Sequence, residues 1–151
     1  MAGSWTEDKA FMEQFSDSIL RSMSAYPRKL IHTDELVHAH DMTFSEIQLL
    51  TLLFMRSVTI EEASRTLNIA KTNLAILTRS LIDKGYMERI TDTKDKRKAF
   101  LAITPLGREE YAAIRDSIAS QLKRLSVRFS KVEIRTMIKA VDQINDVLDE
   151  I

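Results

Sequence analysis

Apolar residues recur every three or four positions along most of the chain, which predicts a mainly α protein. Near the N-terminus the apolar stripe has a spacing of four and runs to about Tyr26, through Phe11, Phe15, Ile19 and Met23. Pro27 should end or kink this helix. The segment from Arg28 to Asp41 has the weakest pattern, and no element is assigned to it.

Four further helix starts are marked by their capping residues. Three segments fit the capping box, in which a hydroxyl and a later carboxylate satisfy free backbone amides: Thr43 with Glu46, Thr59 with Glu62, and Ser130 with Glu133. Thr104 followed by Pro105 is an N-cap with proline at the first helical position. The helix after Pro105 should run to about Leu125.

The middle of the chain predicts a helix-turn-helix. A helix from about Thr59 to Leu67 is followed by a short turn at residues 68–70 and by a second helix from about Lys71 to Lys84, which Gly85 closes. The inward face of the second helix should carry Leu74, Leu77, Thr78 and Leu81, and the outward face Thr72, Asn73, Ile76, Arg79 and Ser80.

A β-hairpin should follow this pair of helices. Residues 87–91 form its first strand, and in the second strand Ala99, Leu101 and Ile103 alternate with Phe100 and Ala102, the period of a half-buried strand. The chain is therefore predicted to be mainly α with a small β-hairpin wing, a winged helix-turn-helix lobe over residues 43–104.

Composition narrows the function classes. The 151 residues suit one domain, and the three glycines and two prolines favour helix over an all-β sandwich. The absence of cysteine excludes disulfides, thiolate metal sites and a cysteine redox switch. The chain has no apolar run long enough to span a membrane and no signal-peptide pattern, so we expect a cytoplasmic protein without a membrane partner.

No catalytic constellation is visible, and we expect no enzyme activity and no cofactor. The three histidines, His32, His38 and His40, lie near Glu35 and Asp41 in a loose cluster that could ligate a metal. We expect no metal there.

Charge is unevenly distributed although the net charge is zero. Residues 56–98 hold 10 Lys or Arg against 6 Asp or Glu, whereas residues 1–55 hold 4 against 8 and residues 99–151 hold 8 against 8. The hairpin tip alone carries Lys94, Lys96, Arg97 and Lys98, opposed by Asp92 and Asp95. This distribution suits a lobe that meets phosphates, although chance clustering on a solvated surface could produce a similar imbalance.

Residues of the second helix and of the wing are the candidate DNA contacts. The first turns of a helix in the major groove reach base edges, so Thr72 and Asn73 should read bases while Lys71 approaches a phosphate. Ile76 lies on the same face, and Arg79 could reach base or backbone. Lys94, Lys96 and Lys98 should contact phosphates. Arg97 could enter the minor groove or could pair with Asp95 and hold the hairpin.

The helices near the C-terminus carry apolar seams. The last helix has the alternating spacing of four and three that seeks a partner helix, at Met137, Val141, Ile144, Leu148 and Ile151. The preceding helix has a similar stripe at Tyr111, Ile114, Ile118, Leu122 and Leu125. Both stripes could pack within one monomer or between two.

The chain resembles the MarR (multiple antibiotic resistance regulator) family of bacterial transcription regulators over almost its whole length. The residues that carry the resemblance are 84–89 (KGYMER), 95–97 (DKR) and 101–107 (LAITPLG). One departure is that Ala75 and Ile76 stand where the family often has a Thr-Arg pair, so the polar reader could instead be Asn73 or Arg79. The resemblance also implies that Asp95 orients the Arg97 guanidinium in the minor groove.

The resemblance implies a homodimer that represses transcription from a palindromic operator, with a small-molecule effector bound where the dimerisation region meets the lobe. Residues 1–42 and 105–151 would then be dimerisation helices, with contacts from Phe11, Phe15, Ile19, Met137, Val141, Ile144 and Leu148. A different class of function stays open, in which the winged helix is a protein–protein interaction module without specific DNA binding. Salt dependence separates the two, because phosphate contacts weaken steeply with salt.

Overall fold

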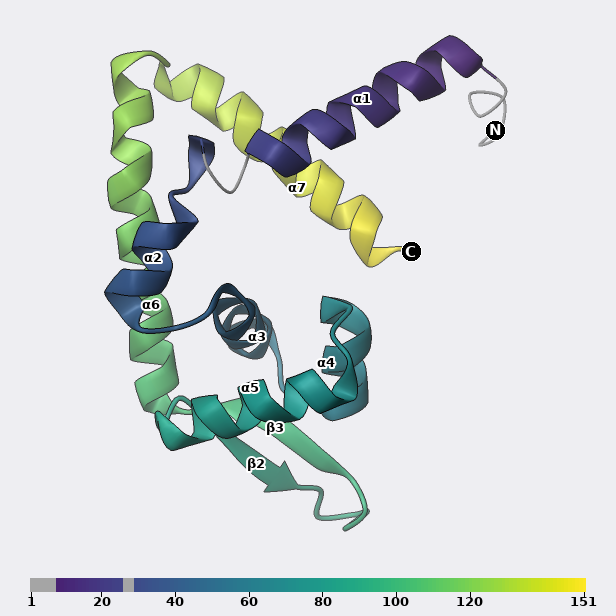
Figure 1. Ribbon diagram of the computed structural model, residues 1–151, viewed down its shortest axis with the longest axis vertical. Helices are drawn as coiled ribbons and strands as arrows, with labels where there is room; N and C mark the ends of the chain where they lie inside the picture. Colours follow the sequence, from purple (N-terminus) through teal and green to yellow (C-terminus); the bar gives the residue numbers. More distant parts are fainter. Residues whose placement is uncertain (1–7, 26–28) are drawn as a thin grey trace. The chain divides into compact units, whose positions relative to one another are not determined.

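The computed structural model describes residues 8–25 and 29–151 and is mainly helical with one small antiparallel sheet (Figure 1). The chain forms two compact units, one ending at Ile118 and the other spanning Ala119–Ile151. The predicted fold class, a mainly α chain with a β-hairpin wing, is confirmed. Among the described residues, no helix is long and apolar enough to cross a membrane.

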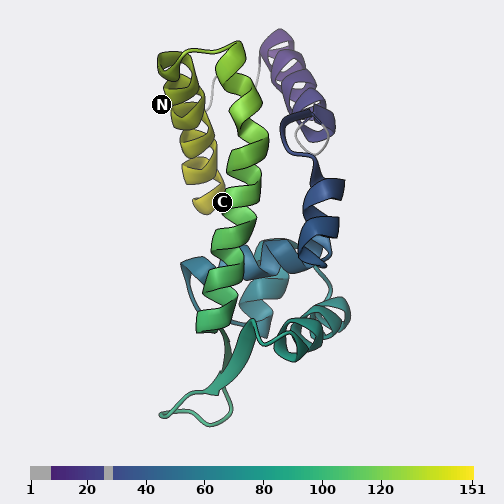
Figure 2. The same cartoon turned by 90° about the vertical axis from the view of Figure 1, so that its left-hand side faces the viewer.

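The first unit contains the helix-turn-helix and the wing. Its helices are α1 (Lys9–Ala25), α2 (Thr33–His40), α3 (Phe44–Met55), α4 (Ile60–Leu67), α5 (Lys71–Asp83) and most of α6 (Pro105–Leu122). Its strands are β1 (Val58–Thr59), β2 (Met87–Thr91) and β3 (Ala99–Ile103). The sheet order is β1-β3-β2, with both pairs antiparallel. Figure 2 shows the β2–β3 hairpin extending away from the helices as a wing.

Helix α3 lies at the centre of the core. Leu49 and Leu50 are fully buried, and they belong to one apolar cluster with Leu74 and Leu81 of α5 and Leu101 of β3. Thr78 is also buried and Leu77 is half-buried, so the predicted inward face of α5 is confirmed. Burial of this face fixes which side of α5 is left for solvent.

The predicted capping boxes all form, each with its two reciprocal hydrogen bonds. In the box before α3, the Thr43 amide donates to Glu46 Oε2 at 2.7 Å and the Glu46 amide donates to Thr43 Oγ1 at 3.2 Å. The boxes before α4 and α7 have the same geometry. At the start of α6 the Gly107 amide donates to Thr104 Oγ1 at 3.0 Å.

Two glycines are required where α5, the wing and α6 meet. Gly85 has φ +78°, the left-handed conformation that was predicted to close α5. At Gly107 a Cβ would lie 2.1 Å from the carbonyl oxygen of Tyr86, so only glycine allows α6 to start this close to the end of α5.

Several elements differ from the sequence predictions. The unassigned segment before Asp41 contains α2, whose Leu36 reaches the core. Strand β1 adds a third strand to the predicted hairpin. The alternation expected in β3 is wrong, because Ala99 is exposed while Leu101, Ala102 and Ile103 are all buried. Strand β3 is the central strand of the sheet, and its second half is buried on both faces. A strand buried on both faces has apolar residues at successive positions, so the alternation disappears.

The first part of the apolar stripe on α6 packs against the core of the first unit. Ile114 is buried, and Tyr111 and Ile118 pack against the core of the first unit, so this part of the stripe packs within the monomer. Helix α6 ends at Leu122, earlier than predicted, and a 3₁₀ helix spans Lys123–Val127.

The second unit ends in α7 (Lys131–Asp149), whose apolar seam is exposed in the single chain. Met137, Val141, Ile144 and Leu148 each expose 40 to 57% of their surface, and Ile151 exposes more. In the first unit, Phe11, Phe15 and Ile19 of α1 are also exposed. Tyr26 and Pro27, where the first helix was expected to end, lie outside the described residues, as does the side chain of Met23.

Candidate nucleic-acid interface

The solvent face of α5 is polar at its amino end and apolar at one position further on. Thr72, Asn73, Ile76 and Arg79 are all exposed, as predicted, and Ile76 exposes 67% of its surface. An exposed isoleucine side chain favours an apolar partner, and the thymine methyl group in the major groove is a partner of this kind. The face therefore combines hydrogen-bonding side chains with one apolar contact.

The amino end of α5 differs from those of α3, α4 and α7. Its N-cap is Ala70, which has no side chain to cap the first turn. The amides of that first turn have no partner within the helix, and Lys71, Thr72 and Asn73, which form the turn, are exposed. Free amides and a lysine together favour the binding of an anion such as a phosphate group.

Lys71 has a carboxylate partner that the sequence analysis did not identify. Its Nζ lies 2.8 Å from Oε1 of Glu61, which is on α4. The hydrogen bond from Lys71 and its positive charge hold the pKa of the Glu61 carboxyl below its ordinary value. Both side chains are more than 60% exposed, so the pair is weak and Lys71 can exchange Glu61 for a phosphate.

Ser80 is the one residue predicted for the outward face of α5 that faces the protein. It is half-buried and its hydroxyl donates to the carboxylate of Glu46, which is only 4% exposed. Burial opposes the ionised form of Glu46, but the hydrogen bonds from Ser80 and Thr43 and the charge of Lys84 outweigh it and lower its pKa. The structural reason is that α3 packs along this side of α5.

The wing tip holds its cations on a backbone framework made by two aspartates. Asp92 Oδ1 accepts from the Lys94 amide at 2.9 Å, and Asp95 Oδ1 accepts from the Arg97 amide at 3.1 Å. The loop is closed by the Lys98 amide, which donates to the Asp95 carbonyl at 2.9 Å. The side chains of Lys94, Lys96, Arg97 and Lys98 are all exposed.

The structure bears on the two roles considered for Arg97, entry into the minor groove and pairing with Asp95. Asp95 does hold the hairpin, but it bonds the main chain of Arg97, and among the described residues no ion pair joins the Arg97 guanidinium to Asp95. That the carboxylate orients the guanidinium in the minor groove stays a prediction. The guanidinium projects from a fixed turn as an exposed cation.

The histidines do not gather around a metal position. Within the described ranges no group of three His, Cys, Asp or Glu residues could hold a metal ion. His32 is paired with Glu35 at 3.4 Å, whereas His40 contacts Glu110 and Ser117 of α6.

Comparison with known proteins agrees with this geometry. Residues 42–107 match a protein family described as a winged helix DNA-binding domain, which includes the whole helix-turn-helix and wing. No curated protein sequence matches the chain.

Solved structures of similar fold cover nearly the whole chain. BldR, a transcriptional regulator from Sulfolobus solfataricus, superimposes with a TM-score of 0.70 at 16% identity, over 93% of this chain and 96% of its own. Wild-type MarR from E. coli gives 0.68 at 18% identity, over 85% and 95%. A MepR variant from S. aureus, bound to an oligodeoxyribonucleotide, gives 0.62 at 18% identity, over 88% and 97%. At identities this low, the superpositions establish that the fold is shared and nothing further.

Proposed function

The chain has the winged-helix fold of the MarR-type DNA-binding transcription regulators, and we propose that it is a homodimeric, sequence-specific repressor that a small molecule releases from DNA. The observation that carries the proposal is the placement of two DNA-ready surfaces on one unit. The uncapped, exposed amino end of α5 and the basic wing tip both belong to the lobe that matches a DNA-binding family.

Within this proposal, α5 is the recognition helix. Thr72 and Asn73 lie on its exposed first turn, where base edges in the major groove are reached. Lys71 and Arg79 supply contacts to phosphate or base, and Ile76 supplies an apolar contact. The MepR variant in complex with an oligodeoxyribonucleotide supports DNA as the partner of this fold.

The wing is proposed to make the second contact. Arg97 enters the minor groove, while Lys94, Lys96 and Lys98 meet phosphates. Asp95 contributes indirectly, because its hydrogen bond to the Arg97 amide fixes the turn from which that side chain projects.

The homodimer is supported by the exposed apolar seams. The stripe of α7 at Met137, Val141, Ile144 and Leu148, together with Phe11, Phe15 and Ile19 of α1, leaves large apolar side chains in water in the single chain. A second copy that covers this surface would remove the free-energy cost of exposing apolar side chains to water. A two-fold dimer would also present two recognition helices to a palindromic site.

Release by a small molecule rests on the resemblance to MarR-type regulators, and an open hollow in the first unit is its candidate site. Its volume is about 410 Å³, and it lies where α2, α3 and α5 meet. Apolar Val37 and Met42 line it together with polar Glu46, Ser80 and Lys84. A mixed lining of this kind suits a small organic molecule that carries one polar group.

Asn73→Ala tests the sequence-reading part of the proposal. Duplexes selected from random DNA by the wild-type protein should lose about 1–3 kcal/mol of binding to the variant, with preference relaxed at one position in each half-site. Binding to random duplex should change little. Equal losses on the selected and random duplexes would contradict base reading by Asn73.

Salt dependence distinguishes the proposal from a protein-interaction module. Binding to the selected duplex should weaken steeply between low and moderate salt, because each phosphate contact releases counterions. Failure to recover any preferred duplex would remove the regulator proposal and would favour the interaction module.

A further inference from the structure

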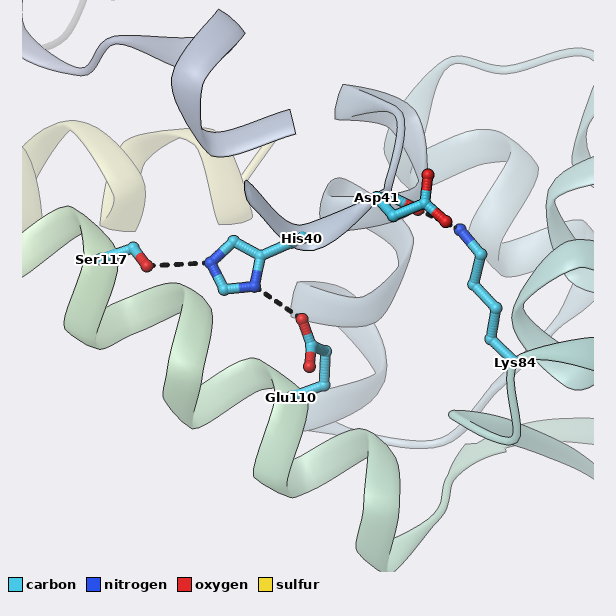
Figure 3. Close-up of polar contacts among 5 residues, drawn as sticks. All are labelled: His40, Asp41, Lys84, Glu110 and Ser117. Atoms are coloured by element: carbon cyan, nitrogen blue, oxygen red, sulfur yellow. Dashed lines mark hydrogen bonds and ion pairs between the residues drawn. The ribbon is translucent and has the colours of Figure 1, made fainter. Parts of the chain in front are cut away.

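The carboxyl end of α2 is tied to α6 by a buried histidine. The side chain of His40 is only 9% exposed, and its Nδ1 lies 2.6 Å from Glu110 Oε1. Its Nε2 lies 2.9 Å from Ser117 Oγ, two turns further along the same helix. Figure 3 shows the ring between these two partners. Both ring nitrogens are therefore used, and rotation of the imidazole is restricted.

The next residue ties the same point to the end of the recognition helix. Asp41 ends α2 in the left-handed conformation with φ +48°, and its carbonyl accepts a hydrogen bond from Lys84 Nζ (Figure 3). Lys84 directly follows α5, and its ammonium also lies 3.6 Å from the buried carboxylate of Glu46. The end of α5 is thus held to both α2 and α3.

A second route reaches the same end of α5 through Glu110. The Tyr86 phenol lies near Glu110, and burial together with that carboxylate raises the pKa of the phenol. The main chain of Tyr86 is fixed as well, since its amide donates to Leu81 at 2.9 Å and its carbonyl accepts from Thr104 at 3.0 Å. On one side of the left-handed Gly85, Lys84 is thus bonded to the residue that follows His40, and on the other side Tyr86 lies near Glu110, which is a partner of His40.

We propose that His40 is a positioning residue for DNA binding, which together with Glu110 fixes the carboxyl end of α5 against α6 without touching DNA. The proposal rests on α5 being the recognition helix. The DNA-facing residues at 71–79 lie on one rigid helix with Lys84 at its end, so a small shift at that end moves every base contact. A recognition site of this kind must be held to about half an ångström by supporting contacts.

Removing the imidazole should loosen this support. Glu110 and Ser117 would each lose a partner in a site that is largely closed to water, which makes the present arrangement of α6 and α2 less favourable than alternatives. The loss should appear as poorer discrimination between DNA sequences, because phosphate contacts tolerate small displacements better than base contacts do.

The test compares His40→Ala with His38→Ala and Glu110→Gln with Glu109→Gln. The control residues are exposed neighbours on the same helices. Affinity is measured for the selected duplex and for random duplex at one salt concentration, with the folded fraction measured by circular dichroism. We expect the ratio of the two affinities to fall about tenfold for His40→Ala and Glu110→Gln and less than about twofold for the controls. His40→Gln, which keeps one donor and one acceptor, should recover part of the ratio.

Hydrogen exchange without DNA provides the second measurement. The amides of Lys84 and Tyr86 should exchange faster in His40→Ala and Glu110→Gln than in the controls. An unchanged affinity ratio, or a reduced ratio with unchanged exchange at these amides, would overturn the proposal. If His40→Ala does not fold, Glu110→Gln decides alone. If the wild-type protein prefers no duplex, the proposed function fails, and unchanged exchange would then show separately that His40 does not position α5.

Discussion

Lys71 illustrates how a single residue can serve two partners at the proposed DNA interface. It opens α5 and carries the charge best placed for a phosphate, yet in the free chain it is paired with Glu61 at 2.8 Å. DNA must therefore compete with a carboxylate for this lysine. Glu61 also adds a negative charge close to the proposed DNA-facing surface, which repels the backbone of any duplex regardless of its sequence.

Glu61→Gln should strengthen DNA binding without a gain in specificity. The variant frees Lys71 and removes a repulsive charge, so we expect random and selected duplexes to bind more tightly by similar, small factors. Affinity titrations on both duplexes measure this, with Glu109→Gln as the matched charge change. Weaker binding by Glu61→Gln would show that the pair holds Lys71 in its DNA-binding position.

Arg97 and Lys96 offer a matched pair of cations on one exposed turn. Arg97→Ala should weaken binding and reduce the preference for A-rich flanking sequence, where the narrow minor groove attracts arginine. Lys96→Ala should lower affinity uniformly and reduce the salt slope by roughly 1. Binding to duplexes with A-rich and G·C-rich flanks, over a series of salt concentrations, distinguishes them. Identical effects of the two variants would argue that Arg97 is a phosphate contact.

At the scale of elements, the junction of α3 with α5 depends on one buried carboxylate. Glu46 completes the capping box of α3, accepts from Ser80 of α5 and pairs with Lys84. Its pKa in the folded chain is lowered, so it stabilises the fold above its ordinary pKa of about 4.3 and ceases to do so as pH falls through the lower, folded value.

Glu46→Gln should therefore be less stable than the wild type at neutral pH, by about 1 kcal/mol or more. The difference should begin to shrink as pH falls below about 4.3, where the carboxyl of the unfolded chain takes up a proton, and should disappear as pH falls through the lower, folded pKa. Thermal unfolding between neutral pH and pH 3 measures it. Glu62 and Glu133 cap other helices, and their pKa values are lowered by hydrogen bonds from Thr59 and Ser130. Some acid dependence should thus persist in the variant. A constant difference at every pH would contradict the assigned role of the Glu46 charge.

For the whole molecule, the decisive question is what covers the seam of α7. Ile144 lies in the middle of this stripe and exposes 53% of its surface in the single chain. A second copy is the proposed cover, and the symmetry of a dimer is what makes a palindromic operator the natural target.

Ile144→Glu should abolish the dimer and with it specific DNA binding, because an unpaired carboxylate buried in the interface costs several kcal/mol. Gln143→Glu adds the same charge off the stripe and should leave the dimer intact. Sedimentation and binding to the selected duplex check both. A dimeric Ile144→Glu protein with unchanged affinity would mean that the seam is not the interface.

Local sequence by itself determined where most helices begin and which face of α5 is open. Capping boxes such as Thr43 with Glu46 act over three residues, and the burial of Leu74 and Leu81 follows from helical periodicity alone. The left-handed turn at Gly85 was predictable for the same reason. These features depend on neighbours in the chain, so the order of residues suffices to predict them.

Only the tertiary structure decided which side chains meet across elements. Strand β1 is too short to show a pattern and exists because Val58 pairs with Leu101. His40 contacts residues 70 and 77 positions away, and no local period relates it to Glu110 or Ser117. Glu61 likewise reaches Lys71 only because the turn between α4 and α5 brings them together. Such contacts depend on how elements pack, and packing is a property of the whole fold and of no single segment.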